Sequence, residues 1–125
     1  MTLGQLMEQW EGKMVKLMFN PITIRLKGVS FGDTQSNIKQ FGCPDTGFYI
    51  LVREPDNPHD ANAIAVSLCG IWHMGYVPKN WASKLAPMMD AGREFDAEFV
   101  SVNQYPPHER VGLTVRIVEA TPSQS

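Results

Sequence analysis

Six short segments of this chain are apolar at every second position or nearly throughout, and this pattern constrains the fold more than any other feature of the sequence. In residues 22–27, Ile22, Ile24 and Leu26 alternate with polar residues, which is the period of a strand with one buried face. The segments are short and are separated by turn-forming residues. The predicted strands are 22–27, 48–52, 62–68, 71–77, 95–99 and 111–117.

One helix is predicted between the fourth and fifth of these strands. Trp81, Leu85, Met88 and Met89 recur at helical spacing, with proline at position 78 near the start and glycine at position 92 just past the end. Pro87 lies inside this pattern and lacks a backbone donor, so we expect a kink or a split near residue 86.

A second helical pattern occupies the N-terminal residues before Pro21. Leu3, Leu6, Trp10 and Leu17 belong to an apolar stripe at helical spacing, which predicts an amphipathic helix. The stripe either packs on the domain's own core or docks a partner or a second copy of the chain. We therefore divide the chain into an amphipathic helical extension (1–20), a β-barrel domain (21–119) and a disordered tail (120–125).

The fold class follows from the order of these elements. About six strands with one helical crossover, and without regular βαβ alternation, predict a mostly β fold, a compact antiparallel six-stranded β-barrel. A chain of 125 residues is long enough for one such core and too short for a second.

Charge and composition limit the classes of function that this chain can have. The net charge of −2 argues against extensive binding to a phosphate backbone. Residues 1–40 nevertheless carry five basic against three acidic side chains, so any nucleic-acid site must be local. No stretch is apolar enough to span a bilayer and no signal peptide is evident, so we expect a cytoplasmic protein without a membrane partner. The two cysteines lack metal-ligand spacing, and we expect no metal and no cofactor.

A turn-rich string, Arg-Glu-Pro-Asp-Asn-Pro-His-Asp, follows the second predicted strand at residues 53–60. Asn57 and Asp60 are residues that bond nearby backbone amides, so a tight chain reversal is one sufficient explanation of the string. Together with the segments 28–31 (Gly-Val-Ser-Phe) and 75–79 (Gly-Tyr-Val-Pro-Lys), the string resembles the HIRAN domain, a module found in DNA-repair ATPases and also encoded alone. The resemblance covers about residues 22–118 and implies a compact SH3-like or OB-like barrel.

The resemblance also implies a pocket for the 3′ end of single-stranded DNA. Asp60 matches the acidic position that accepts a hydrogen bond from the terminal 3′-hydroxyl and repels a terminal phosphate. Asn57 matches a neighbouring polar position, and Lys79 matches a basic position that pairs with a backbone phosphate. Phe31 and Tyr76 match positions that lie against the terminal bases.

Two positions depart from the pattern of the family members that bind DNA. Ser30 stands where an arginine precedes the first aromatic residue, so a bidentate phosphate donor is lost. His59 stands where tyrosine usually precedes the loop aspartate, and its ring can still stack on a base.

We therefore expect a non-catalytic module, not an enzyme, that captures single-stranded DNA or DNA ends in repair or replication. His59 lacks a third ligand for a metal beside Asp56 and Asp60, and no activated nucleophile is evident. The alternative is a protein-interaction or assembly module that keeps the barrel and docks a partner, or forms a homodimer, through its N-terminal helix. Low positive charge and Ser30 favour this alternative.

Overall fold

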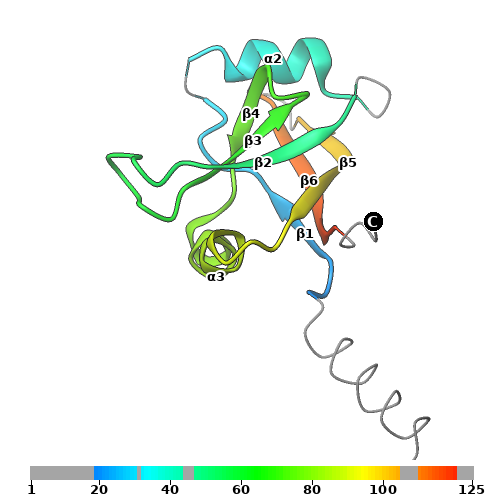
Figure 1. The fold of residues 1–125 in the computed structure, drawn as a ribbon. Helices are drawn as coiled ribbons and strands as arrows, with labels where there is room; N and C mark the ends of the chain where they lie inside the picture. Colours follow the sequence, from blue (N-terminus) through cyan, green and yellow to red (C-terminus); the bar gives the residue numbers. More distant parts are fainter. Residues whose placement is uncertain (1–18, 31, 44–46, 105–109, 121–125) are drawn as a thin grey trace, which may run out of the picture.

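The computed structural model of this chain describes residues 19–30, 32–43, 47–104 and 110–120, which form one six-stranded antiparallel sheet and two helices (Figure 1). The six predicted strands are confirmed, with ends that shift by a few residues. In chain order the elements are β1 (Ile22–Arg25), α2 (Thr34–Phe41), β2 (Tyr49–Arg53), β3 (Ile64–Leu68), β4 (Trp72–Tyr76), α3 (Lys79–Asp90), β5 (Phe95–Asn103) and β6 (Gly112–Glu119).

The sheet curves until its two edge strands meet. Its strand order is β1-β6-β5-β2-β3-β4, which places β1 and β4 at opposite edges. Just beyond β1, Lys27 pairs with Tyr76: each backbone N–H donates to the other residue's carbonyl, at 2.7 and 2.8 Å. Among the described residues this single bridge joins the edges, so the predicted barrel is a half-barrel with a narrow seam.

The core lies inside this curved sheet. On β3, Ile64, Val66 and Leu68 point inward at the strand period and are completely buried, as are Leu113 and Ile117 on β6. The helix α3 closes one end of the sheet with its buried residue Leu85, and α2 lies across the other end (Figure 1).

The helix α2 was not expected, because the sequence predicts only one helix after the N-terminal segment, at the position of α3. Helix α2 has only eight residues, most of them polar, and Ile38 is its one fully buried apolar residue, so the segment is too short and too polar to show a helical repeat in the sequence. Polar tertiary contacts hold it in addition to the packing of Ile38 in the core. Gln35 Nε2 donates to the carbonyls of Val29 and Val111 at 2.8 and 2.7 Å, and Gln35 Oε1 accepts from Val111 N at 2.9 Å.

The helix α3 is confirmed, and of the predicted kink or split near residue 86 the split is wrong. The helix runs without interruption from Lys79 to Asp90. Pro87 lies in its last turn, where its missing N–H costs one backbone bond, and the Pro87 carbonyl still accepts from Ala91 N at 3.0 Å. The buried residues Leu85 and Ala86 hold this end of the helix against the sheet.

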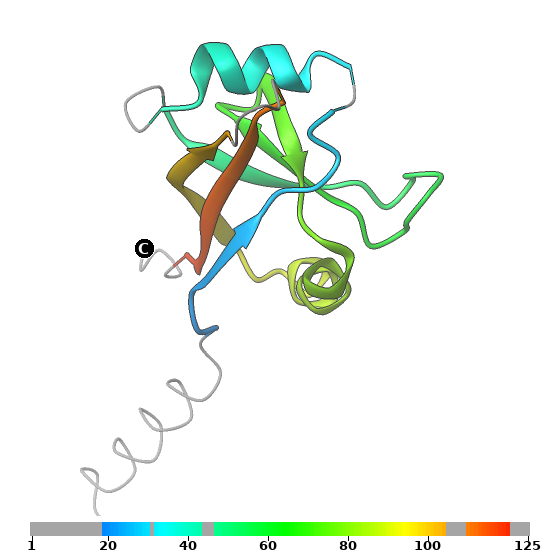
Figure 2. The same ribbon diagram turned by 180° about the vertical axis from the view of Figure 1, so that it is seen from behind.

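The predicted amphipathic helix (1–20) and tail (120–125) lie outside the described residues, apart from positions 19, 20 and 120. Their boundaries therefore stay predictions. Phe19 packs edge-on against Trp81 and Phe95, with ring centroids 6.4 and 5.2 Å away. Figure 2 shows this start of the described chain at the end of the half-barrel where α3 lies.

Candidate functional site

A pocket of about 770 Å³ opens beside the seam where the two edges of the sheet meet. Three segments contribute to it: residues 27 and 28 just after β1, the loop of residues 54–63 between β2 and β3 (the β2–β3 loop), and the junction from β4 into α3. Figure 1 shows the β2–β3 loop extending from the body of the domain on this side. The lining residues are Lys27, Gly28, Asn57, His59, Asp60, Ala63, Tyr76, Val77, Pro78, Lys79 and Asn80.

Asn57 builds the β2–β3 loop. Its Oδ1 accepts from the backbone N–H groups of His59 and Asp60, at 2.9 and 3.2 Å, and its Nδ2 donates to Glu54 Oε1 at 3.0 Å. These bonds replace backbone pairing where the chain reverses, as asparagine does in Asx turns. The predicted tight reversal is therefore present, and it shapes one wall of the pocket.

Asp60 keeps one carboxylate oxygen available. Its Oδ1 accepts from Asn62 N at 2.9 Å, which fixes the side chain, whereas Oδ2 has no hydrogen-bond partner among the described residues. The neighbouring His59 is exposed and lines the pocket, and its backbone N–H donates to Asn57 Oδ1 within the loop. The pocket thus presents a fixed hydrogen-bond acceptor next to an accessible ring.

Tyr76 joins the β4 edge to the loop through Glu54. The Tyr76 hydroxyl donates to Glu54 Oε1 at 2.9 Å, the same oxygen that accepts from Asn57. Burial raises the pKa of the Tyr76 phenol above its ordinary value, and the bond to the Glu54 carboxylate raises it further. The ring therefore stays neutral and oriented at the pocket wall.

Two lysines flank this acceptor. Lys79 is the first residue of α3, and Lys27 follows β1; both are exposed and both line the pocket. The backbone of Lys27 is fixed by its bridge to Tyr76, so the seam itself sets the position of this cation. Ammonium groups at these two positions can bind a phosphate of a ligand while the Asp60 carboxylate accepts a hydrogen bond from a nearby hydroxyl of the same ligand.

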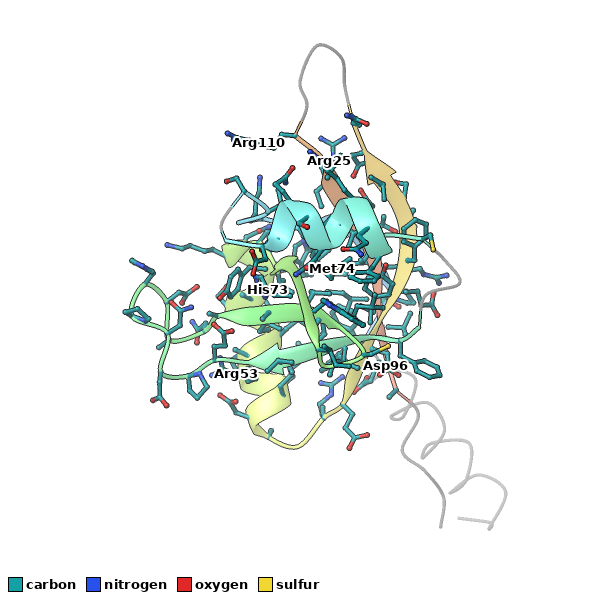
Figure 3. All side chains as sticks on the ribbon, turned by 90° about the horizontal axis from the view of Figure 1, so that it is seen from above. Arg25, Arg53, His73, Met74, Asp96 and Arg110 are labelled. Atoms are coloured by element: carbon teal, nitrogen blue, oxygen red, sulfur yellow. The ribbon has the colours of Figure 1, made fainter. Side chains whose placement is uncertain are left out.

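Arg53 anchors the far end of the β2–β3 loop to α3. Its Nη1 donates to the carbonyls of Ala61 and Ala63, at 3.1 and 2.9 Å. Its Nε and Nη2 donate to the two carboxylate oxygens of Asp90, at 2.9 and 3.1 Å. Figure 3 shows Arg53 on the side of the sheet from which the loop extends. The loop is thus held at both ends.

His73 lies behind the pocket wall and gives the domain a pH dependence. Burial lowers the pKa of its imidazole below the ordinary value of 6.5, against the opposing effect of Glu54. As the pH falls through 6.5, the unfolded chain takes up a proton and the folded protein does not, so the free energy of unfolding decreases until the lowered pKa is reached.

We expect the urea midpoint to fall more between neutral pH and about pH 5.5 in the natural protein than in His73→Phe, which keeps a ring against Tyr76. An NMR titration of the imidazole is the direct check. A folded-state pKa above 6.5 contradicts the prediction.

Of the six site residues predicted from the sequence, the structure brings five together in the pocket: Asn57, His59, Asp60, Tyr76 and Lys79. The sixth, Phe31, lies outside the described residues. Two neighbours were missed. Lys27 was predicted only as a residue on the solvent-exposed face of a strand. Glu54, which orients Asn57 and Tyr76, was predicted only as part of a turn. The signal for Lys27 was its position directly before Gly28 of the quoted motif.

Within the ranges that the structure describes, no three His, Cys, Asp or Glu side chains gather so that they could hold a metal ion. Over the same ranges, no helix is long and apolar enough to cross a bilayer.

The fold and the pocket define a small, mostly β domain with an open, largely apolar pocket that carries a few polar groups at the seam of a half-barrel. The sequence model of the HIRAN domain matches residues 48–119, more than half of the chain. The chain belongs to the HIRAN domain family. No curated protein sequence matches it.

Two solved structures have a similar fold. The crystal structure of the HIRAN domain of human HLTF has a TM-score of 0.58 and 19% sequence identity, over 82% of this chain and 76% of that one. A protein from Lactobacillus plantarum has the same TM-score of 0.58 and 19% identity, over 81% of this chain and 100% of that one. At this identity the likeness establishes the fold and leaves function to the site.

Proposed function

We propose that this chain is a non-catalytic module that binds single-stranded DNA and prefers a strand with a free 3′-hydroxyl. The observation that carries the proposal is the convergence of Asn57, His59, Asp60, Tyr76 and Lys79 on one pocket. They come from two segments separated by the whole of β3, and all five match positions of the HIRAN pattern in the sequence. Binding of free ends in DNA repair or replication belongs to the same proposal.

Asp60 supplies the selectivity for the end. The Oδ2 of its carboxylate, which has no hydrogen-bond partner in the described part of the chain, accepts a hydrogen bond from a terminal hydroxyl, and its negative charge repels a terminal phosphate. Because Oδ1 is already held by Asn62 N, little side-chain freedom is lost when the hydroxyl binds.

Lys79 and the pocket rings supply the affinity. The ammonium of Lys79 pairs with the phosphate nearest the end, and this contact is weakened by salt. His59 and Tyr76 offer ring surfaces on which bases stack without regard to sequence, each worth about 1–3 kcal/mol in such sites.

The test is fluorescence anisotropy of a short 5′-labelled single strand with a free 3′-hydroxyl, at two salt concentrations. Its 3′-phosphorylated twin and a blunt duplex are the matched controls. We expect the hydroxyl strand to bind most tightly and the affinity to fall as salt rises. Absence of binding at tens of micromolar protein contradicts the proposal.

The second candidate is a protein-interaction or assembly module that docks a partner or a second copy through residues 1–20. The net charge of −2 and the serine at position 30 in place of an arginine favour it. Sedimentation of the full chain over a range of concentrations distinguishes the two. Concentration-dependent dimerisation together with absent oligonucleotide binding supports this second function.

A further inference from the structure

The solvent face of β1 carries basic side chains that lead away from the pocket. Along the segment from Ile24 to Lys27, the buried residues Ile24 and Leu26 alternate with the exposed residues Arg25 and Lys27. Arg25 and Lys27 therefore lie on the same face. Two residues of a strand advance about 6.7 Å, which is close to the separation of successive phosphates in an extended single strand.

The neighbouring strand extends this face. Arg116 of β6 lies opposite Thr23 of β1, so it is the diagonal neighbour of Arg25 on the same side of the sheet. Its side chain is 50% exposed, and its contact with Glu98 is long, at 4.0 Å. Figure 3 shows Arg25 at the periphery of the fold.

The charge of the sheet changes sign beyond β6. The next strand, β5, exposes Asp96 and Glu98, and Glu98 is paired with Arg116 in the register of the two strands. A polyanion is therefore attracted to β1 and the adjacent part of β6 and repelled from β5. This confines the favourable surface to one line that begins at the pocket.

We infer that Lys27, Arg25 and Arg116 form a phosphate track that guides the strand, in the 5′ direction, away from the captured 3′ end. Lys27 belongs both to the pocket and to the track and binds the first phosphate outside the terminal nucleotide. Arg25 binds the next one, and Arg116 contributes a weaker attraction. The inference rests on the proposed function, because the pocket fixes where the track begins.

The track makes affinity depend on strand length. Unlabelled oligothymidylates of two, four and eight nucleotides, all with free 3′-hydroxyls, are used to compete with a labelled strand. In the natural protein we expect the affinity to rise from two to four nucleotides and then to level off. In Arg25→Gln we expect the increase in affinity from two to four nucleotides to be about two- to fivefold smaller, which is the effect of losing one exposed ion pair. The slope of log affinity against log salt concentration should become shallower by about 0.7.

The controls separate the track from the pocket. Arg25→Lys keeps the positive charge, and we expect it to retain most of the increase in affinity with strand length. Lys39→Gln removes a cation from α2 that does not line the pocket, and we expect it to leave this increase unchanged. Affinity for the dinucleotide stays the same in Arg25→Gln. If the dinucleotide binds with the expected end preference but neither length nor Arg25→Gln changes the affinity, the track is wrong and the pocket stands. If no oligonucleotide binds the natural protein, the proposed function itself is wrong.

Discussion

Replacing Asp60 with asparagine is expected to abolish the preference for a 3′-hydroxyl over a 3′-phosphate. Hydrogen bonds to a charged group contribute about 1.5–3 kcal/mol, so the natural preference should be at least roughly tenfold. Asparagine retains an oxygen that can accept from Asn62 N, and the loop geometry is kept while the charge is removed. We expect the hydroxyl strand to bind more weakly and the phosphorylated strand to bind at least as well as before.

The measurement is a pair of anisotropy titrations for each variant. Asp56→Asn is the matched control, because Asp56 is an exposed carboxylate of the same loop that does not line the pocket. Asp60→Ala tests the role of the bond to Asn62 N in addition, since it removes both oxygens. An unchanged preference in Asp60→Asn removes this carboxylate from end recognition.

The second large effect concerns Gly75, where the edge of β4 approaches the segment after β1. Gly75 has φ +139°, and a Cβ there would lie 2.9 Å from Leu26 Cβ and 3.1 Å from the Lys27 carbonyl oxygen. The contacting atoms are backbone or lie next to it, so they cannot move aside easily. Gly75→Ala combines a strained backbone with overpacking and should cost about 2–5 kcal/mol of the free energy of unfolding.

Urea denaturation followed by tryptophan fluorescence measures this loss, and we expect the midpoint to fall by about 1–2 M. Gly92→Ala is the matched control. Gly92 has φ +98° and no atom within 4 Å of its added Cβ, so it isolates the backbone strain. If Gly75→Ala and Gly92→Ala lose the same free energy of unfolding, the close approach of position 75 to Leu26 and Lys27 contributes nothing to the loss.

The two predictions concern the same place in the fold. Gly75 allows the edge strands to approach, the neighbouring Tyr76 bridges to Lys27, and this bridge fixes a pocket lysine. We therefore expect Gly75→Ala to weaken oligonucleotide binding more than Gly92→Ala does, in protein that remains folded. Stability and the geometry of the proposed site depend on one close contact.

The sequence by itself determined the strands and the crossover helix, and its resemblance to the HIRAN pattern selected most of the candidate-site residues. The strands follow from a period of two, because alternate side chains of a strand face opposite sides and only one side is buried. The turn chemistry of the string at residues 53–60 predicts the chain reversal, and the resemblance of the same string to the HIRAN pattern named Asn57 and Asp60 as site residues. Such features depend on neighbours close along the chain, and these are visible in the sequence.

Only the tertiary structure decided the helix α2, the half-barrel and the membership of Lys27 in the pocket. Gln35 holds α2 through bonds to Val111, 76 residues away, and an isolated glutamine gives no sign of such a partner. Lys27 and Tyr76 meet because the sheet curves until its edges touch, and that curvature accumulates from the twist between all six strands. Contacts between distant segments depend on the geometry of the whole sheet, which no local pattern of residues encodes.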